Sequence, residues 1–259
     1  MTTIAIWNVN SVRARIENIK VWLEKASPDI LLMQEIKCQD EQFPAMDFQA
    51  MGYHSLIKGQ KSYHGVAILS KQEPTLIMDR LPGEDEDEQA RYLEADIGGI
   101  RAACLYLPNG NPINTEKFPY KLRWMERLKQ RMETLLAEEI PVVFGGDYNV
   151  CPTNDDCYDP VGFSNDALCQ PESRAAFRSM LNLGMTEAFR TVNKTPHIYS
   201  YWDYTGGAYQ KDNGVRIDHF LMTPQAADLM EDCVIDREPR AQMKASDHTP
   251  VILTLRDAA

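Results

Sequence analysis

Hydrophobic residues along the chain form many short runs and a few longer segments with helical spacing. The short apolar runs are typical of strands and lie at residues 3–8, 30–34, 65–69, 92–97, 101–105, 141–145, 198–202, 216–222, 233–236 and 250–255. Helical spacing at 12–25 and 117–137, and a proline-initiated segment at 171–183, predict three helices. The polar stretch 151–170 predicts an irregular loop.

This order of elements predicts a layered α/β fold. Strands outnumber helices and the helices occur singly, which favours packed sheets with helices outside them. No Gly-, Ser- or Pro-rich linker divides the chain and no low-complexity tract occurs. We therefore expect one domain over residues 1–259, built as an α/β sandwich.

The composition narrows the possible classes of function. The chain has 259 residues, of which 44% are apolar, and a formal net charge of -11. No apolar stretch reaches membrane length and residues 1–4 already begin a strand, so we expect a cytoplasmic protein without membrane contact, and a monomer by default. A net anion is repelled by nucleic acid beyond a Debye length, so binding to DNA would depend on local basic clusters.

The cysteines show no recognisable spacing. Six of them stand at positions 38, 104, 151, 157, 169 and 233, without a Cys-x-x-Cys pair or a matching histidine spacing. The sequence therefore predicts neither a zinc site nor a disulfide framework, and we expect reduced thiols.

Four of the predicted strands have polar clusters at their ends. These are Asn8 with Asn10, Gln34 with Glu35, Asp147 with Asn149, and Asp247 with His248. If the clusters converge, Glu35 with Asn10 and Asp247 would supply a partial oxygen shell for Mg²⁺, leaving positions for a phosphate oxygen. The pattern predicts metal-assisted hydrolysis of phosphate esters.

Hydrolysis of a phosphodiester also needs a group that orients water and donors around the developing charge. We expect Asp147 to act on the water and His248 to contact the phosphate, with Asp218 holding the other imidazole nitrogen. Asn149, Asn8 and Tyr106 would supply neutral donors. Each of these residues alone could equally be a turn former or a cap, and only their combination favours catalysis.

Five segments of the chain together resemble the exonuclease III family, within the endonuclease/exonuclease/phosphatase superfamily. They are Trp7 to Arg15, Gln34 to Lys37, Gly145 to Asn149, Arg216 to Asp218 and Ser246 to His248. The resemblance covers essentially the whole chain. It implies a four-layered α/β sandwich, dependence on Mg²⁺ or Mn²⁺, and DNA repair at abasic sites and blocked 3′ ends, with the same metal and catalytic residues.

The resemblance also suggests how the protein holds DNA. It implies that Tyr201, Val215 and Ile217 form a pocket for an extruded baseless sugar. Bulky Leu168 stands where abasic endonucleases often have a small residue, and would weaken incision at internal abasic sites. Basic residues near loop ends, including Arg13, Lys61 and Arg216, are candidate phosphate contacts.

Three alternatives to an abasic endonuclease remain at the level of sequence. The first is an enzyme that mainly removes 3′ phosphates or terminal nucleotides and incises abasic sites weakly. The second is a phosphatase of the same superfamily acting on other phosphate esters. The third is a catalytically silent binder of damaged DNA, which divalent-metal-dependent turnover would exclude.

Overall fold

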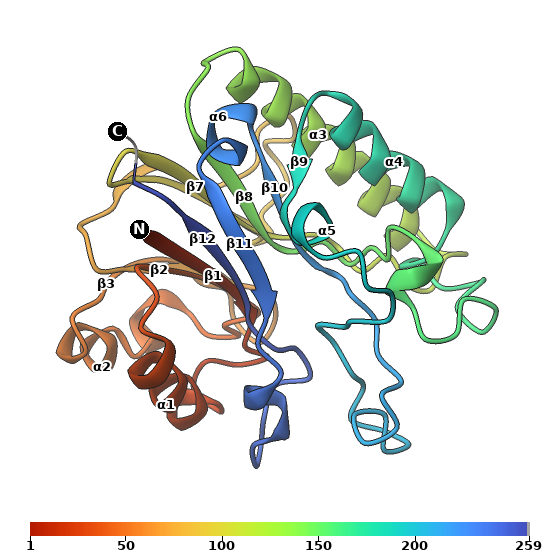
Figure 1. The fold of residues 1–259 in the computed structure, drawn as a ribbon, viewed down its shortest axis with the longest axis horizontal. Coiled ribbons are helices and arrows are strands. Elements are labelled where there is room, and N and C mark those ends of the chain that lie inside the picture. The colour runs from red at the N-terminus through yellow and green to blue at the C-terminus, as the bar shows by residue number, and fades with distance from the viewer. Residues whose placement is uncertain (258–259) are drawn as a thin grey trace.

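The computed structural model describes residues 1–257, in which two six-stranded sheets pack face to face (Figure 1). The first sheet has the order β11 (Met230–Ile235), β12 (Val251–Leu255), β1 (Thr2–Asn8), β2 (Ile30–Gln34), β4 (Val66–Ser70) and β3 (His54–Lys58). The second has the order β5 (Thr75–Met78), β6 (Tyr92–Ile97), β7 (Ile100–Tyr106), β8 (Val142–Asp147), β10 (Asp218–Met222) and β9 (Thr186–Glu187).

Helices cover the outer face of each sheet (Figure 1). The helices are α1 (Ile16–Ala26), α2 (Ala45–Ala50), α3 (Lys117–Leu136), α4 (Pro171–Asn182), α5 (Ala188–Val192) and α6 (Pro224–Ala227). Short 3₁₀ turns, η1 (Asp40–Gln42), η2 (Asn154–Asp156) and η3 (Glu238–Ala241), interrupt the loops. With α1 and α2 outside the first sheet and α3 and α4 outside the second, the predicted four-layered α/β sandwich is confirmed.

Alternation along the strands builds the layers. In β1, Ile4 and Ile6 face the core between the two sheets, whereas Ala5 and Trp7 pack in the cluster that includes residues of α1. Successive side chains of a strand point to opposite faces, so a strand covered on both sides is apolar throughout. The ring of Trp7 meets Trp22 of α1 edge to face, with ring centroids 5.4 Å apart.

Several predicted elements differ from those observed. Residues 198–202 are not a strand: Tyr201 makes only isolated bridges, to Val215 and His248. The strand predicted to start at Arg216 starts at Asp218. Strands β3, β5 and β9 and helices α2, α5 and α6 were not predicted, because short elements with partly exposed faces lack a clear period. Among the described residues, no helix combines the length and apolarity needed to cross a bilayer.

Candidate active site

Strand register brings the polar strand ends together. In the first sheet Asn8 lies opposite Gln34, the last residue of β2, so Glu35 follows directly beside it. In the second sheet Asp147 lies between Tyr106 of β7 and Asp218 of β10. The two sheets approach closely just before this point, because a Cβ atom at Gly145 would lie 2.7 Å from Ile6. The same ends of both sheets therefore form one site.

His248 lies at the centre of this site. Its Nδ1 atom is 2.9 and 3.1 Å from the carboxylate oxygens of Asp218, and its Nε2 atom is 3.8 Å from Asp147. Burial alone would lower the pKa of His248, but the charges of Asp218 and Asp147 raise it to about 10. The imidazole is therefore a cation at neutral pH, with Nε2 available as a donor.

Asp147 is the buried acid that faces His248. Its two carboxylate oxygens accept hydrogen bonds from the Asn149 backbone amide at 2.9 Å and the Asn8 side-chain amide at 3.0 Å. Burial raises the pKa of Asp147 to about 7, and the nearby carboxylates of Asp218 and Glu35 add to the rise. A carboxylate with a pKa near neutrality is suited to accept a proton from water.

Glu35 connects the buried acids to the outer part of the site. Its carboxylate accepts from Asn8 at 2.9 Å and pairs with Lys37 at 2.7 Å. Burial alone would raise the pKa of Glu35, but the Lys37 ammonium and the Asn8 amide hold it below its ordinary value. Glu35, Asn10 and Asn149 all have positive φ angles, between 45 and 52°, and such backbone strain in residues other than glycine clusters at functional sites.

The outer part of the site fits a small cation. One ammonium group, that of Lys37, lies 2.7 Å from Glu35 and 2.6 Å from the amide oxygen of Asn10, so both oxygens converge on one position. The other end of the Asn10 amide donates to Asp247 at 3.0 Å. Carboxylate and amide oxygens are the ligands that Mg²⁺ and Mn²⁺ prefer. Glu35, Asn10 and Asp247 are therefore the residues that would hold a divalent metal.

A second group that could hold a metal consists of Asp147, Asp218 and His248, whose ligand atoms lie within 4.8 Å of one another. Here both oxygens of Asp218 already contact Nδ1 of His248, which orients the ring and supports its positive charge. We therefore interpret this group as the acid–base part of the site.

A pocket of about 640 Å³ opens over these residues. Glu35, Tyr106, Asp147, Asn149, Asp247 and His248 line its polar side. The apolar side includes Leu168, Tyr201, Val215 and Ile217, and Leu168 is only 5% exposed. All the residues expected to form a sugar pocket therefore lie beside the acidic cluster, whereas Asn8 and Asp218 are buried behind it and Asn10 is partly exposed outside the pocket lining.

The candidate DNA contacts do not all reach the surface. Arg13 and Lys61 are exposed, as a phosphate contact requires. Arg216 is buried at 1% exposure, and its guanidinium pairs with Asp156 at 2.8 Å and Glu187 at 2.6 Å. The expectation for Arg216 is wrong, because its donors are directed into the protein, where they cross-link two loops.

Two lysines of the site have roles that the sequence did not predict, and one of them, Lys121, was expected to be a basic surface residue. Lys37 stands in the motif that contains Glu35, but only the structure shows it bonded to Asn10. Lys121 is completely buried and donates to the carbonyls of Asn109, Asn149 and Ala167 at 3.1, 2.6 and 3.1 Å. Burial lowers its pKa to about 7. Its place on the buried face of α3, with Trp124, was the available signal.

Comparisons with known proteins find similar sequences and structures over nearly the whole chain. The model of the endonuclease/exonuclease/phosphatase family matches residues 5–248. Exodeoxyribonuclease III of Haemophilus influenzae is 33% identical, over 95% of this chain and 96% of its own length. An AP endonuclease from Archaeoglobus fulgidus has 37% identity and a TM-score of 0.94, covering 98% of this chain and 99% of its own. The 3′ phosphatase NExo from Neisseria, solved with a product DNA hairpin, has 35% identity and a TM-score of 0.96, covering 99% of this chain and 100% of its own.

Proposed function

The chain belongs to the endonuclease/exonuclease/phosphatase family, and we therefore propose that it is a magnesium-dependent nuclease that cleaves DNA at abasic sites and clears blocked 3′ ends. The coarser class, a DNA repair nuclease of the exonuclease III and AP endonuclease type, follows from relatives that match nearly the whole chain. The observation that carries the proposal is the continuous chain of contacts from Asp218 through His248, Asp147 and Asn8 to Glu35.

Three residues of this chain have separate roles in hydrolysis. Asp147, whose pKa lies at about 7, orients the attacking water and accepts its proton. His248, held as a cation by Asp218, donates from Nε2 to a non-bridging phosphate oxygen. Burial and the Glu35 carboxylate raise the pKa of Tyr106 well above its ordinary value, so its hydroxyl remains a donor.

A divalent cation held by Glu35, Asn10 and Asp247 would supply charge neutralisation at a phosphate oxygen. Four carboxylates, of Glu35, Asp147, Asp218 and Asp247, face only two cations, Lys37 and His248, in this cluster. The excess negative charge favours uptake of such a cation. Mg²⁺ is the proposed ion, with Mn²⁺ as a substitute of similar chemistry.

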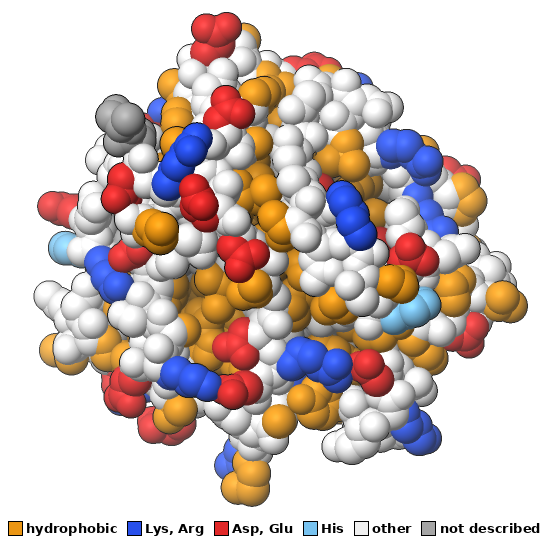
Figure 2. All heavy atoms as spheres, viewed as in Figure 1, with side chains coloured by type: hydrophobic (Ala, Val, Ile, Leu, Met, Phe, Trp, Pro, Cys, Tyr) orange, Lys and Arg blue, Asp and Glu red, His pale blue; other side chains and the backbone are white. Residues whose placement is uncertain are grey.

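The substrate proposed is duplex DNA with an abasic site or a blocked 3′ end. On the face shown in Figure 2, acidic and basic side chains are interspersed and no broad basic surface forms. Contacts from a few exposed cations such as Arg13 and Lys61, with Lys211 at the pocket, would hold the backbone. Few phosphate contacts imply a shallow salt dependence of binding, since each contributes about 0.9 to the logarithmic slope.

The test uses two labelled duplexes, one with an internal abasic analogue and one with a 3′ phosphate, each with Mg²⁺ and with chelator. The proposal expects metal-dependent cleavage and its loss in Asp147→Asn. Metal-independent binding without turnover of either duplex would instead establish a silent binder of damaged DNA. Turnover only of phosphate esters unrelated to DNA would move the protein to another branch of the family.

A second candidate function, mainly 3′-end cleaning with weak abasic incision, is favoured by Leu168. This side chain packs with Val215, Ile217 and Tyr201 in the wall of the pocket. A Leu168→Ala variant should raise abasic incision relative to 3′-phosphate release in the same preparation, which controls for any loss of folded protein. Efficient abasic incision by the unmodified protein would exclude the idea.

A further inference from the structure

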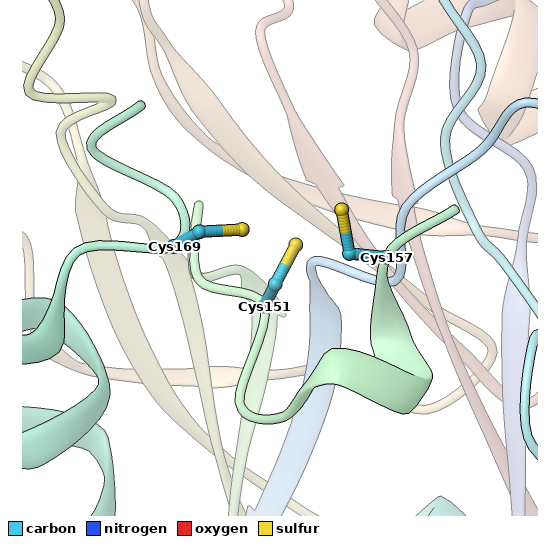
Figure 3. Close-up of side chains that lie close together, drawn as sticks. All are labelled: Cys151, Cys157 and Cys169. Carbon is cyan, nitrogen blue, oxygen red and sulfur yellow. The ribbon is translucent and has the colours of Figure 1, made fainter. Parts of the chain in front are cut away.

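Three of the six cysteines meet behind the wall of the pocket (Figure 3). The Sγ atoms of Cys151, Cys157 and Cys169 all lie within 4.8 Å of one another, and the three side chains point toward a shared space. All three residues are buried, with exposures of 0, 0 and 7%. The spacing of the cysteines in the sequence gives no signal for this group, because it forms only where the loop between β8 and α4 folds back on itself.

Backbone hydrogen bonds fix the three thiols in place. The amide of Cys151 donates to the carbonyl of Leu168 at 2.9 Å, which brings Cys169 beside Cys151. The amide of Cys157 donates to the carbonyl of Asn154 at 3.2 Å, and Cys157 also forms a bridge with Val215. The triad is therefore assembled by the fold before any ligand arrives, which lowers the ordering cost of binding.

Hydrogen bonds with Cys151 and Cys169 lower the pKa of the Cys157 thiol, whereas burial raises the pKa of the Cys151 thiol. An arginine near the triad supplies a positive charge. Arg174 donates from Nε to the Cys151 carbonyl at 2.9 Å and from one terminal nitrogen to Asn154 at 2.9 Å. Its other terminal nitrogen is buried without a hydrogen-bond partner. A positive charge next to a cysteine stabilises the thiolate, which is the form that binds metals.

We propose that Cys151, Cys157 and Cys169 bind one thiophilic d¹⁰ cation, Zn²⁺ or Cu⁺, as three thiolates. Binding forms three metal–sulfur bonds and releases the thiol protons. Zn–S bonds of about 2.3 Å place the sulfurs about 3.8–4.0 Å apart in tetrahedral or trigonal geometry. The observed limit of 4.8 Å allows this arrangement with small side-chain rotations.

This site differs in kind from the catalytic one. Soft thiolates select Zn²⁺ or Cu⁺, whereas Mg²⁺ prefers the oxygen ligands of Glu35, Asn10 and Asp247. The cysteines do not line the pocket, but they pack with Leu168, Val215 and Ile217, which do. A bound cation would therefore tie together three points of the loop that carries Leu168, and since Cys157 of this loop is bridged to Val215, it would stiffen the pocket wall.

The test is a titration of the full chain, reduced and freed of metal, with Mg²⁺ in excess to fill the carboxylate site. Cd²⁺ alone serves as the first probe, because its bond to a thiolate gives an ultraviolet charge-transfer band that oxygen ligands do not give. We expect one equivalent to produce the band and to raise the unfolding midpoint of the protein. Zn²⁺ and, without oxygen, Cu⁺ are then titrated in competition, and the one that displaces Cd²⁺ at lower concentration is the preferred ion.

The variants separate the triad from the other thiols. Cys157→Ala should weaken Cd²⁺ binding by at least about 100-fold, since even outer residues of metal sites cost about 10–100-fold. Cys233→Ala, which alters a buried cysteine in the core between the sheets, should bind as the wild type does. Should Cys157→Ala fail to fold, Cys157→Ser decides, because its hydroxyl keeps the size of the side chain but is a far weaker ligand for a thiophilic cation.

Three outcomes would overturn the proposal. One is the absence of a charge-transfer band at one equivalent of Cd²⁺. Another is equal binding by Cys157→Ala and the wild type. The third is a disulfide within the triad of the isolated protein together with no cation uptake after reduction.

Discussion

Replacing Asp218 by Asn should change how activity depends on pH. The carboxylate of Asp218 contacts Nδ1 of His248 at 2.9 and 3.1 Å and is the largest charge holding the imidazole protonated. Asn has the same shape and can still accept a hydrogen bond, and the hydroxyl of Ser200, 2.6 Å from Asp218, can rotate to suit an amide. The variant therefore removes charge and keeps geometry.

The size of the pKa shift at His248 sets the size of the effect expected in Asp218→Asn. The difference between the ordinary pKa of 6.5 and the value of about 10 for His248 corresponds to about 5 kcal/mol in favour of the imidazolium, at about 1.4 kcal/mol per pH unit. Burial opposes the charged form in both proteins, while Asp147 at 3.8 Å continues to support it. If Asp218 supplies half of the stabilisation or more, the pKa of His248 falls by about 2 units or more.

The raised pKa of His248 decides at which end of the pH range the variant loses activity. A raised pKa keeps His248 charged below about pH 10 in the wild type, and the charge is lost as pH rises through that value. In Asp218→Asn the charge is lost at about pH 8 or below. With a pKa of about 8, about one tenth of the variant would still carry the charge at pH 9, so we expect kcat to fall by about 10-fold there, and by more if the pKa is lower. At pH 6, where both proteins carry the charge, the loss should be much smaller.

The assay is the initial rate of 3′-phosphate release at saturating Mg²⁺, from about pH 6 to about pH 10.5, so that the range spans the pKa of His248 at about 10, with ¹⁵N spectra of the histidines to follow protonation. Ser200→Ala is the matched control, because it removes a hydrogen bond to Asp218 and leaves the carboxylate charge. Its activity should fall at the same pH as that of the wild type. Parallel profiles for the wild type and Asp218→Asn would refute the role of Asp218 in holding the charge.

Three further predictions follow from the buried charges. Asp147→Asn should abolish turnover and spare DNA binding, measured by anisotropy, since charge at the water is lost and shape is kept; near-normal turnover would contradict the mechanism. Lys121→Met removes the ammonium donor from the carbonyls of Asn109 and Asn149, whereas Ala167 keeps its bond from Ser173; the change should cost about 3 kcal/mol in urea unfolding and lower kcat, and unchanged stability would count against this positioning role. Glu187, next to Arg216, has its pKa lowered from 4.5 to about 2, so its contribution is present above pH 4.5 and is lost as pH falls toward 2. Glu187→Gln should therefore cost about 3 kcal/mol at pH 7 and much less near pH 2–3, and an equal cost at both pH values would exclude the ion pair as its source.

The sequence was most informative where a strand ended in a polar residue. A buried strand is recognisable from its apolar run, and the polar residue after it must leave the sheet at a defined edge. Asn8, Glu35 and Asp147 were identified in this way, and the register pairs of β1 with β2 and of β7, β8 and β10 then explain their proximity. The layered fold was predicted on the same basis and confirmed.

The sequence was least informative about side chains whose partners are distant along the chain. Arg216 looked like a surface cation, because its partners Asp156 and Glu187 lie 60 and 29 positions away. Residues 198–202 looked like a strand, but the amides of Ser200 and Tyr201 both donate to the single carbonyl of Val215. The local sequence pattern does not show the charge of a partner that lies far away along the chain. It also does not show whether a segment forms the hydrogen-bond ladder of a sheet.

Sequence alone therefore determined the longer strands and helices, the layered packing and the residue types at the active edge, because these depend on apolar periodicity and on where each strand ends. Tertiary structure decided which charges are buried, which lysine contacts which carboxylate, and that Cys151, Cys157 and Cys169 share one space. Those features depend on loop closure over many residues, and no short-range pattern specifies where two loops will meet.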